Sequence, residues 1–100
     1  MIFGYRVDGC QITEEDRELI EAKLSKLQKL DNRLSKDDDT VKFHVNVFRG
    51  TRHHSPNYAL HVQLTFPGNS LRAKASGKTI PDAADEVERK LRVQVGKLKN

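Results

Sequence analysis

The spacing of the apolar residues changes twice along the chain, and this change constrains the fold more than any other feature of the sequence. Between residues 19 and 34 apolar side chains recur every three or four positions, as on the buried face of an amphipathic helix. Over residues 41–48, 58–66 and 71–75 apolar and polar residues alternate, which is typical of half-buried strands. The helical spacing returns over residues 80–98. The two predicted stripes are Leu19, Ile20, Leu24, Leu27, Leu30 and Leu34, and Ile80, Ala84, Val87, Leu91, Val95 and Leu98.

Capping residues mark where the two helices begin. Thr13 stands three residues before Asp16, which is close to a capping box, so we expect the first helix to begin there and to run through the leucine stripe. The acidic run at residues 37–39 ends the helical pattern and predicts a loop. Thr79, with Pro81 close behind it, predicts the start of the second helix.

β-favouring residues in alternation, separated by turn signals, predict four strands. The turn signals are Asp8-Gly9 and the run Pro67-Gly68-Asn69-Ser70. The predicted strands are residues 2–8, 41–48, 58–66 and 71–75.

Residues 49–57, between the two middle strands, are expected to form an exposed, flexible and basic loop. A hairpin that is symmetric about this loop keeps all apolar residues on one face. It pairs Val45 with Leu60, Phe43 with Val62, and His44 with His61.

These elements predict an α+β fold in the order β-α-β-β-β-α, a four-stranded mixed sheet with two helices packed on one face. The first two strands are joined through a helix, so we expect them to be parallel with a right-handed crossover. At 100 residues the chain has room for one hydrophobic core, which predicts a single domain over residues 1–100.

The charge distribution favours a nucleic-acid partner. The net charge of +4 suits a polyanion, and basic residues gather on one flank of the first predicted helix and late in the second. Further basic positions lie on the fourth predicted strand. The candidate contacts are Lys23, Lys26, Lys29, Arg33, Arg72, Lys74, Arg89, Lys90 and Lys97.

Other interpretations of the same charges stay open. A charged helix flank can serve solvation alone. Acids near a helix N-terminus and bases near its C-terminus stabilise any helix, and the second predicted helix follows that rule. Of the aromatic residues only Phe48 falls on the predicted polar face, so we expect recognition of RNA shape and backbone rather than of splayed bases.

Catalytic chemistry is not indicated. Cys10 is the only cysteine, has no evident base, and fits a reducing compartment, so we expect a cytoplasmic protein without a disulfide. His44 and His61 alone make an incomplete metal ligand set. No apolar segment is long enough to span a membrane. We therefore expect no enzyme activity, no cofactor, no metal and no small-molecule substrate.

Several short strings, in this order and spacing, resemble the ribosome hibernation-promoting factors, also called ribosome-associated inhibitors or sigma-54 modulation proteins. The resemblance covers nearly the whole chain. Its departures are a short stretch from Gly9 to Thr13, a long loop between the middle strands, and Pro81 in place of the usual acidic-aromatic pair. The strings are Ile12-Thr13, Lys23-Leu24-Ser25-Lys26-Leu27, Leu71-Arg72-Ala73-Lys74-Ala75, Ala83-Ala84-Asp85, Lys90-Leu91 and Gln94.

This resemblance implies a protein that binds 16S ribosomal RNA between the head and body of the small subunit, over the messenger and transfer RNA positions, and stops translation under stress. It implies ribosomal RNA contacts at Lys23, Lys26, Lys90 and Lys97. The chain looks like a short form of the family without the C-terminal dimerisation domain, and we expect a monomer off the ribosome. The alternatives are a general double-stranded RNA-binding module of similar shape and a protein-interaction domain whose charges only solvate it.

Overall fold

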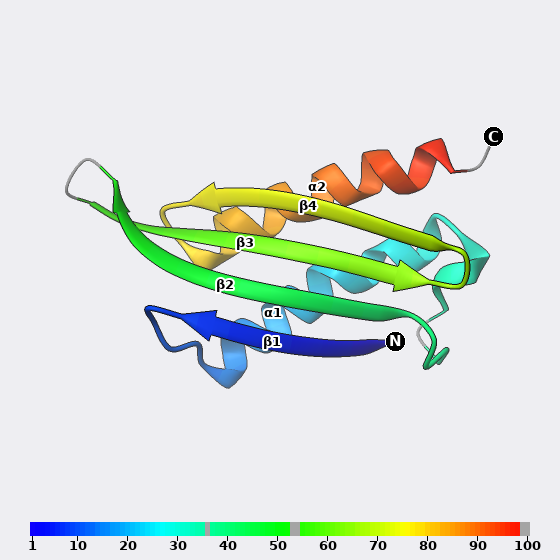
Figure 1. Cartoon of the computed structure of the whole chain (residues 1–100), viewed down its shortest axis with the longest axis horizontal. Helices are drawn as coiled ribbons and strands as arrows, with labels where there is room; N and C mark the ends of the chain where they lie inside the picture. Colours follow the sequence, from blue (N-terminus) through cyan, green and yellow to red (C-terminus); the bar gives the residue numbers. More distant parts are fainter. Residues whose placement is uncertain (36, 53–54, 99–100) are drawn as a thin grey trace.

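The computed structural model describes residues 1–35, 37–52 and 55–98, and it has the predicted order β-α-β-β-β-α (Figure 1). Two short 3-10 helices, η1 and η2, follow the first helix. The elements are β1 (Ile2–Asp8), α1 (Glu14–Ser25), η1 (Lys26–Lys29), η2 (Asn32–Leu34), β2 (Lys42–Arg52), β3 (Ser55–Phe66), β4 (Asn69–Gly77) and α2 (Ile80–Lys97).

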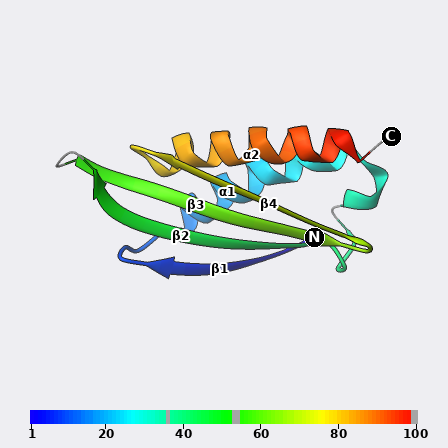
Figure 2. The ribbon, with the colours of Figure 1, turned by 45° about the horizontal axis from the view of Figure 1, so that its top comes forward.

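The four strands form one mixed sheet in the order β1-β2-β3-β4. β1 and β2 are parallel, as expected from their connection through α1, and the other two pairs are antiparallel. Both helices lie on the same face of this sheet, so the other face is left uncovered (Figure 2). The predicted fold class is therefore confirmed.

The core lies between the sheet and the two helices. It is built from residues that the apolar spacing predicted to be buried. Phe43 and Val45 of β2 are fully buried, as are Leu91 and Val95 of α2. β4 contributes small residues to this face, mainly Ala73 and Ala75, beneath α2. Each large side chain that leaves water in this way stabilises the fold by about 1.5–3 kcal/mol before the entropic cost of ordering it.

Both predicted helix starts are confirmed. The Thr13 hydroxyl accepts a hydrogen bond from the Asp16 N–H at 3.1 Å, and the Thr13 N–H donates to the Asp16 carboxylate at 2.9 Å, which completes the capping box. The Thr79 hydroxyl accepts from the Asp82 N–H at 3.2 Å, with Pro81 in the first turn. Side chains thus satisfy N–H groups that have no partner within the helix.

The prediction of one continuous first helix was wrong. The α-helix ends at Ser25, and two 3-10 turns carry the chain onward, with Asp31 extended between them at φ −153° and ψ 128°. The Asp31 carboxylate accepts from the Arg33 N–H at 2.9 Å and thereby caps η2. An Asp side chain that bonds nearby backbone competes with helix formation, which explains the interruption between η1 and η2. Leu27 and Leu34 are still fully buried, so the apolar spacing is satisfied without a continuous helix.

The prediction of a nine-residue loop between the middle strands was also wrong, because β2 and β3 stay paired as far as Arg52 and Ser55. Of that predicted loop only residues 53 and 54 lie outside the described residues. The observed register is displaced by two residues from the predicted one, which preserves the inward face because side chains alternate with a period of two. The observed partners are Val45 with Val62, Phe43 with Leu64, His44 with Gln63, and His61 with Asn46.

Among the described residues no helix combines the length and the apolar composition needed to cross a bilayer.

Candidate nucleic-acid interface

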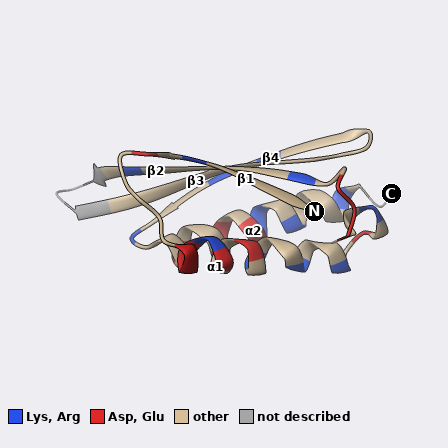
Figure 3. Ribbon diagram, turned by 90° about the horizontal axis from the view of Figure 1, so that it is seen from below, with Lys and Arg blue, Asp and Glu red and all other residues tan. Residues whose placement is uncertain are grey.

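The helical layer is electrically polarised along its length. α1 and α2 run in the same direction along the sheet, so their N-terminal turns lie at one end of the layer and their C-terminal turns at the other (Figures 1 and 2). Within α1 and α2, Figure 3 shows mainly acidic residues toward the first end and mainly basic residues toward the second, while further acidic residues, Asp31 and the run 37–39, follow α1 in the chain. The basic residues of the second end are Lys23, Lys26, Lys29, Arg33, Arg89, Lys90, Arg92 and Lys97. The acidic residues of the first end are Glu14, Glu15, Asp16, Glu18, Glu21, Asp82, Asp85, Glu86 and Glu88.

A small hollow of about 160 Å³ lies between the two helices, where the acidic and basic ends meet. Lys23 of α1 forms an ion pair with Asp85 of α2 across it. The hydrogen bond from Lys23 holds the pKa of the Asp85 carboxyl below its ordinary value and outweighs the opposing effect of desolvation. The positive charges of Lys23, Lys26 and Arg89 lower this pKa as well. We call this site the interhelical hollow; it is lined by Lys23, Lys26, Asp85, Glu88, Arg89 and Arg92.

Arg92 belongs to this site although the sequence prediction did not nominate it. Its guanidinium forms two hydrogen bonds with the Glu88 carboxylate, one of them 3.0 Å from Nε to Oε1. Glu88 is 6% exposed and is the one buried charged residue in the described chain, so its carboxylate depends on this partner. The spacing of four residues between Glu88 and Arg92 is the signal by which the pair could have been found.

Three of the nominated cations are also held by carboxylates. Besides Lys23, Arg33 lies 2.6 Å from Asp31, and Arg89 lies 2.9 Å from Glu86. Each of these pairs has at least one partner largely open to solvent, so its cation can exchange the carboxylate for a phosphate. By contrast Lys26, Lys29 and Lys97 are exposed and form no ion pair within the described residues.

Lys90 differs from the other nominated lysines in its hydrogen-bond partner. Its ammonium donates a 2.6 Å hydrogen bond to the main-chain oxygen of Lys74 on β4. An ammonium has three donors, so this contact leaves Lys90 able to bind a phosphate as well. The RNA contact of Lys90 therefore stays a prediction. Its hydrogen bond to β4 gives it a structural role at the edge of the sheet as well.

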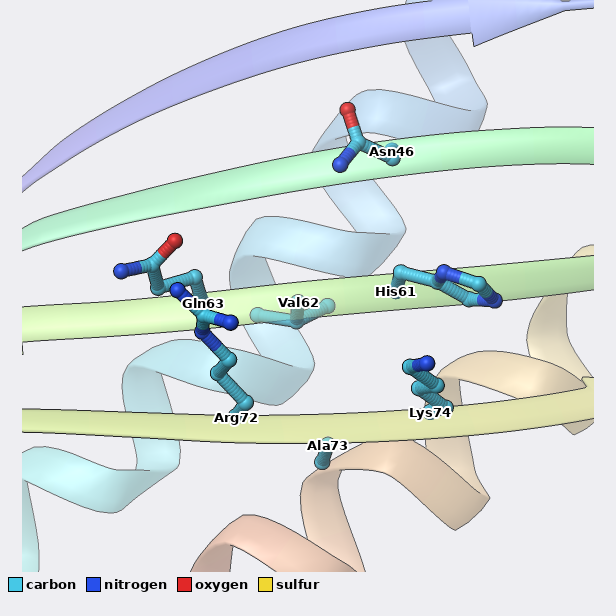
Figure 4. A pocket seen from close by; sticks show the side chains of 7 residues that line it. All are labelled: Asn46, His61, Val62, Gln63, Arg72, Ala73 and Lys74. Atoms are coloured by element: carbon cyan, nitrogen blue, oxygen red, sulfur yellow. The ribbon is translucent and has the colours of Figure 1, made fainter.

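Arg72 and Lys74 lie on the opposite side of the molecule from the other nominated residues. Their side chains are exposed, whereas their neighbour Ala73 is buried against the helices, because successive side chains of a strand point to opposite faces. They line a shallow pocket of about 260 Å³ on the uncovered face of the sheet (Figure 4). We call this the sheet-face pocket; it is lined by Asn46, His61, Val62, Gln63, Arg72, Ala73 and Lys74.

The nine nominated residues therefore do not form one continuous surface. Seven belong to the helical side, and the two from β4 belong to the open face of the sheet. No group of three or more histidine, cysteine, aspartate or glutamate side chains suited to a metal ion occurs among the described residues. In the observed register His44 and His61 are not paired with each other.

The solved structures with this fold include one from Coxiella burnetii and one from Thermus thermophilus. A ribosomal subunit interface protein from Coxiella burnetii is 21% identical over 99% of this chain and 98% of its own, with a TM-score of 0.75. The N-terminal domain of Protein Y from Thermus thermophilus is 18% identical over 98% of this chain and 96% of its own, with a TM-score of 0.68. At these identities the likeness shows the shared fold.

The comparison with families is more specific, although no curated protein sequence matches the chain. The sequence model of the family described as Sigma 54 modulation protein / S30EA ribosomal protein matches residues 5–100. This match covers nearly the whole chain and agrees with the resemblance seen in the sequence. The chain belongs to the Sigma 54 modulation protein / S30EA ribosomal protein family.

Proposed function

We propose that this protein binds the small ribosomal subunit through 16S ribosomal RNA, occupies the messenger and transfer RNA positions, and so stops translation while it is bound. Family membership supports this proposal, as does the name of the Coxiella burnetii protein of the same fold, a ribosomal subunit interface protein. The action proposed is occupancy of a site in the cytoplasm by a protein that is monomeric off the ribosome, without a catalytic step.

The observation that carries the proposal is the basic end of the helical layer. Lys26, Lys29 and Lys97 are exposed there without carboxylate partners in the described chain, while the acidic residues of α1 and α2 lie mainly toward the opposite end. Such a separation of charge attracts a phosphate backbone and orients the protein on it, because the acidic end is repelled. Backbone contacts position a protein without reading sequence, which suits a single binding place on a large folded RNA.

The direct test is co-sedimentation with purified small subunits through a sucrose cushion at rising salt concentrations, together with inhibition of cell-free translation. The triple variant Lys26→Gln, Lys29→Gln and Lys97→Gln should lose co-sedimentation at a much lower salt concentration than wild type. The matched control removes three exposed positive charges elsewhere: Arg17→Gln, Arg49→Gln and Lys78→Gln.

The control triple variant should pellet nearly as wild type does. Subunits already carrying messenger and initiator transfer RNA should bind less of the protein, since the two would compete for one place. Absence of co-sedimentation even at low salt would overturn the proposal. Equal binding to a naked RNA duplex and to the subunit would instead favour a general double-stranded RNA-binding module.

A further inference from the structure

The face of the sheet that the helices leave uncovered carries its own set of polar side chains. The strand register aligns these side chains in rows across the sheet. One row contains Arg6, Asn46, His61 and Lys74, and the next contains Gly4, His44, Gln63 and Arg72. Side chains of three different strands thereby converge on the sheet-face pocket (Figure 4).

The positive charges near this pocket are not compensated. On the described part of the open face the one acidic side chain is Asp8, and it lies 3.6 Å from Arg6. Arg72 and Lys74 form no ion pair with any described residue, unlike Lys23, Arg89 and Arg92 on the helical side. An uncompensated guanidinium and ammonium, two residues apart on one strand, suit an extended polyanion.

An aromatic pair lies beside these charges. The rings of Phe48 and His61 are 4.8 Å apart between centroids and inclined at 55°. Burial lowers the pKa of His61, and the charge of Lys74 lowers it further, so the imidazole is neutral at neutral pH. A neutral aromatic pair on a sheet surface offers ring faces on which a base can stack, which is the sequence-tolerant contact of single-strand binders.

The pocket contains hydrogen-bonding groups that suit a base edge. Asn46 offers a side-chain amide, and Gln63 donates a 3.1 Å hydrogen bond to the Ser70 hydroxyl, which leaves its amide oxygen as an acceptor. At about 260 Å³ the pocket is smaller than the roughly 300–1,000 Å³ of drug-sized ligand sites. It therefore suits one residue of a longer chain better than a whole small molecule.

α2 holds the basic strand from the other side. Lys90 donates to the main-chain oxygen of Lys74 at 2.6 Å, and Gln94 donates to that of Arg72 at 2.7 Å. Arg72 and Lys74 therefore have their main-chain oxygens bonded to α2 and their side chains on the open face. Their positions relative to the aromatic pair are thus fixed before any ligand binds, which lowers the entropic cost of binding.

We propose that the open face of the sheet binds a short single-stranded stretch of RNA, with a base against Phe48 and His61 and phosphates at Arg72 and Lys74. This is a second RNA surface, on the side of the molecule opposite to the basic end of the helices, and it rests on the proposed function only in that the polyanion is RNA. A protein partner is less well matched, because protein interfaces have an apolar centre. The large exposed apolar residues of the described chain are Ile2 and Val93, and only Ile2 lies on this sheet, at its end.

The test is a fluorescence anisotropy titration of the intact protein with a labelled, unstructured ten-nucleotide RNA over a range of salt concentrations. Phe48→Leu should weaken binding about tenfold with little change in the salt dependence, since stacking releases no counterions. His61→Gln is a second variant for the same contact if Phe48→Leu does not fold. Arg72→Gln with Lys74→Gln should weaken binding and reduce the magnitude of the log-log salt slope by about 0.7 per residue.

The matched control is Arg17→Gln with Lys78→Gln, which removes the same charge from exposed positions outside both proposed RNA surfaces and should leave binding of the ten-nucleotide RNA nearly unchanged. The inference is overturned if Phe48→Leu and His61→Gln both bind like wild type, or if the control weakens binding as much as the sheet variant. It is also overturned if polyglutamate of equal charge or a ten-base-pair duplex competes as well as the single strand.

Ribosome co-sedimentation separates this inference from the proposed function. A protein that pellets with small subunits but does not bind the ten-nucleotide RNA would contradict the second surface alone. A protein that binds the ten-nucleotide RNA through Phe48 but does not pellet with subunits would contradict the proposed function alone.

Discussion

The ammonium of Lys90 on α2 lies 2.6 Å from the main-chain oxygen of Lys74 on β4 and donates a hydrogen bond to it. One turn later Gln94 makes the same kind of contact with Arg72, at 2.7 Å. β4 is an edge strand, whose outer carbonyls would otherwise be free to pair with a strand of another molecule. α2 thus contributes to the fold twice, through its apolar stripe and by covering this edge with side-chain donors.

Removal of the Lys90 donor tests this role. Lys90→Met keeps most of the aliphatic length but cannot donate, so we expect the free energy of unfolding in urea to fall by about 1 kcal/mol, the usual net value of one hydrogen bond. Lys97→Met on the same helix is the control and should change stability little, since Lys97 is exposed and makes no such contact with any described residue. Equal stability of the two variants would mean that the Lys90 contact contributes nothing to the fold.

Gly77, at the end of β4, marks where the strand passes closest to the first turn of α2. A Cβ at this position would lie 2.8 Å from the Asp82 Cβ and 3.1 Å from the Ala83 nitrogen. Gly77→Ala therefore forces α2 away from the sheet, and we expect a loss of about 1–3 kcal/mol in the free energy of unfolding. Gly96→Ala, with nothing within 4 Å, should instead stabilise α2 by about 0.5–1 kcal/mol. Thermal unfolding of both variants would show opposite shifts of Tm.

The elements and their buried faces could be predicted from the sequence because each depends on neighbours along the chain. The capping threonine Thr13 and the alternation around Val45 are local signals, and both agree with the structure. The end of the α-helix at Ser25 and the extended Asp31 further on could not be read from the leucine spacing, since 3-10 turns bury Leu27 and Leu34 equally well. The hairpin register was missed by two residues because both registers bury the same face.

The candidate site was harder to predict because it depends on how distant elements pack. Lys23 and Asp85 are 62 residues apart in the sequence, and nothing in either local pattern indicates that the two would pair. The separation of Arg72 and Lys74 from the helical side, by contrast, follows from the alternation of β4 with Ala73. It was available in the sequence once the strand was recognised.

The ion pair between Lys23 and Asp85 makes stability depend on pH. Its hydrogen bond lowers the pKa of Asp85 in the folded state, so the folded protein binds a proton at this site less readily than the unfolded chain does. The stabilisation is therefore complete above the ordinary carboxyl pKa of about 4 and is lost as the pH falls through the lower, folded-state value. Asp85→Asn should be less stable than wild type at pH 7, and this difference should vanish in strong acid.

Urea unfolding across pH 2–7 measures this dependence, and Asp37→Asn is the control because Asp37 is exposed and forms no ion pair within the described residues. NMR titration of the carboxyl groups provides an independent reading. Lys23→Met should raise the pKa of Asp85 in the folded state. An unchanged Asp85 titration in that variant would show that Lys23 is not the cause.

The salt dependence of ribosome binding distinguishes lysines that contact phosphates from lysines that only solvate the surface. A phosphate contact releases condensed counterions, so its loss should reduce the magnitude of the log-log salt slope by roughly one unit or somewhat less. We expect this full reduction for Lys26→Ala and Lys97→Ala, which are exposed and have no carboxylate partner among the described residues. Lys23→Ala and Lys90→Ala should reduce the slope less. Asp85 already neutralises Lys23, and the main-chain oxygen of Lys74 already holds the Lys90 ammonium.

This graded order follows from the structure, since the sequence alone made the four lysines equivalent. The measurement is co-sedimentation of each alanine variant with small subunits at several salt concentrations, with the binding constant fitted at each. Sequence of the RNA should not matter, because backbone contacts carry no base information. Unchanged slopes and unchanged association for all four variants would identify these lysines as solvated surface and would remove the helical basic end as the ribosome-binding site. A larger effect at Lys23 than at Lys26 would mean that the ion pair with Asp85 opens on binding and that Lys23 exchanges its carboxylate for a phosphate.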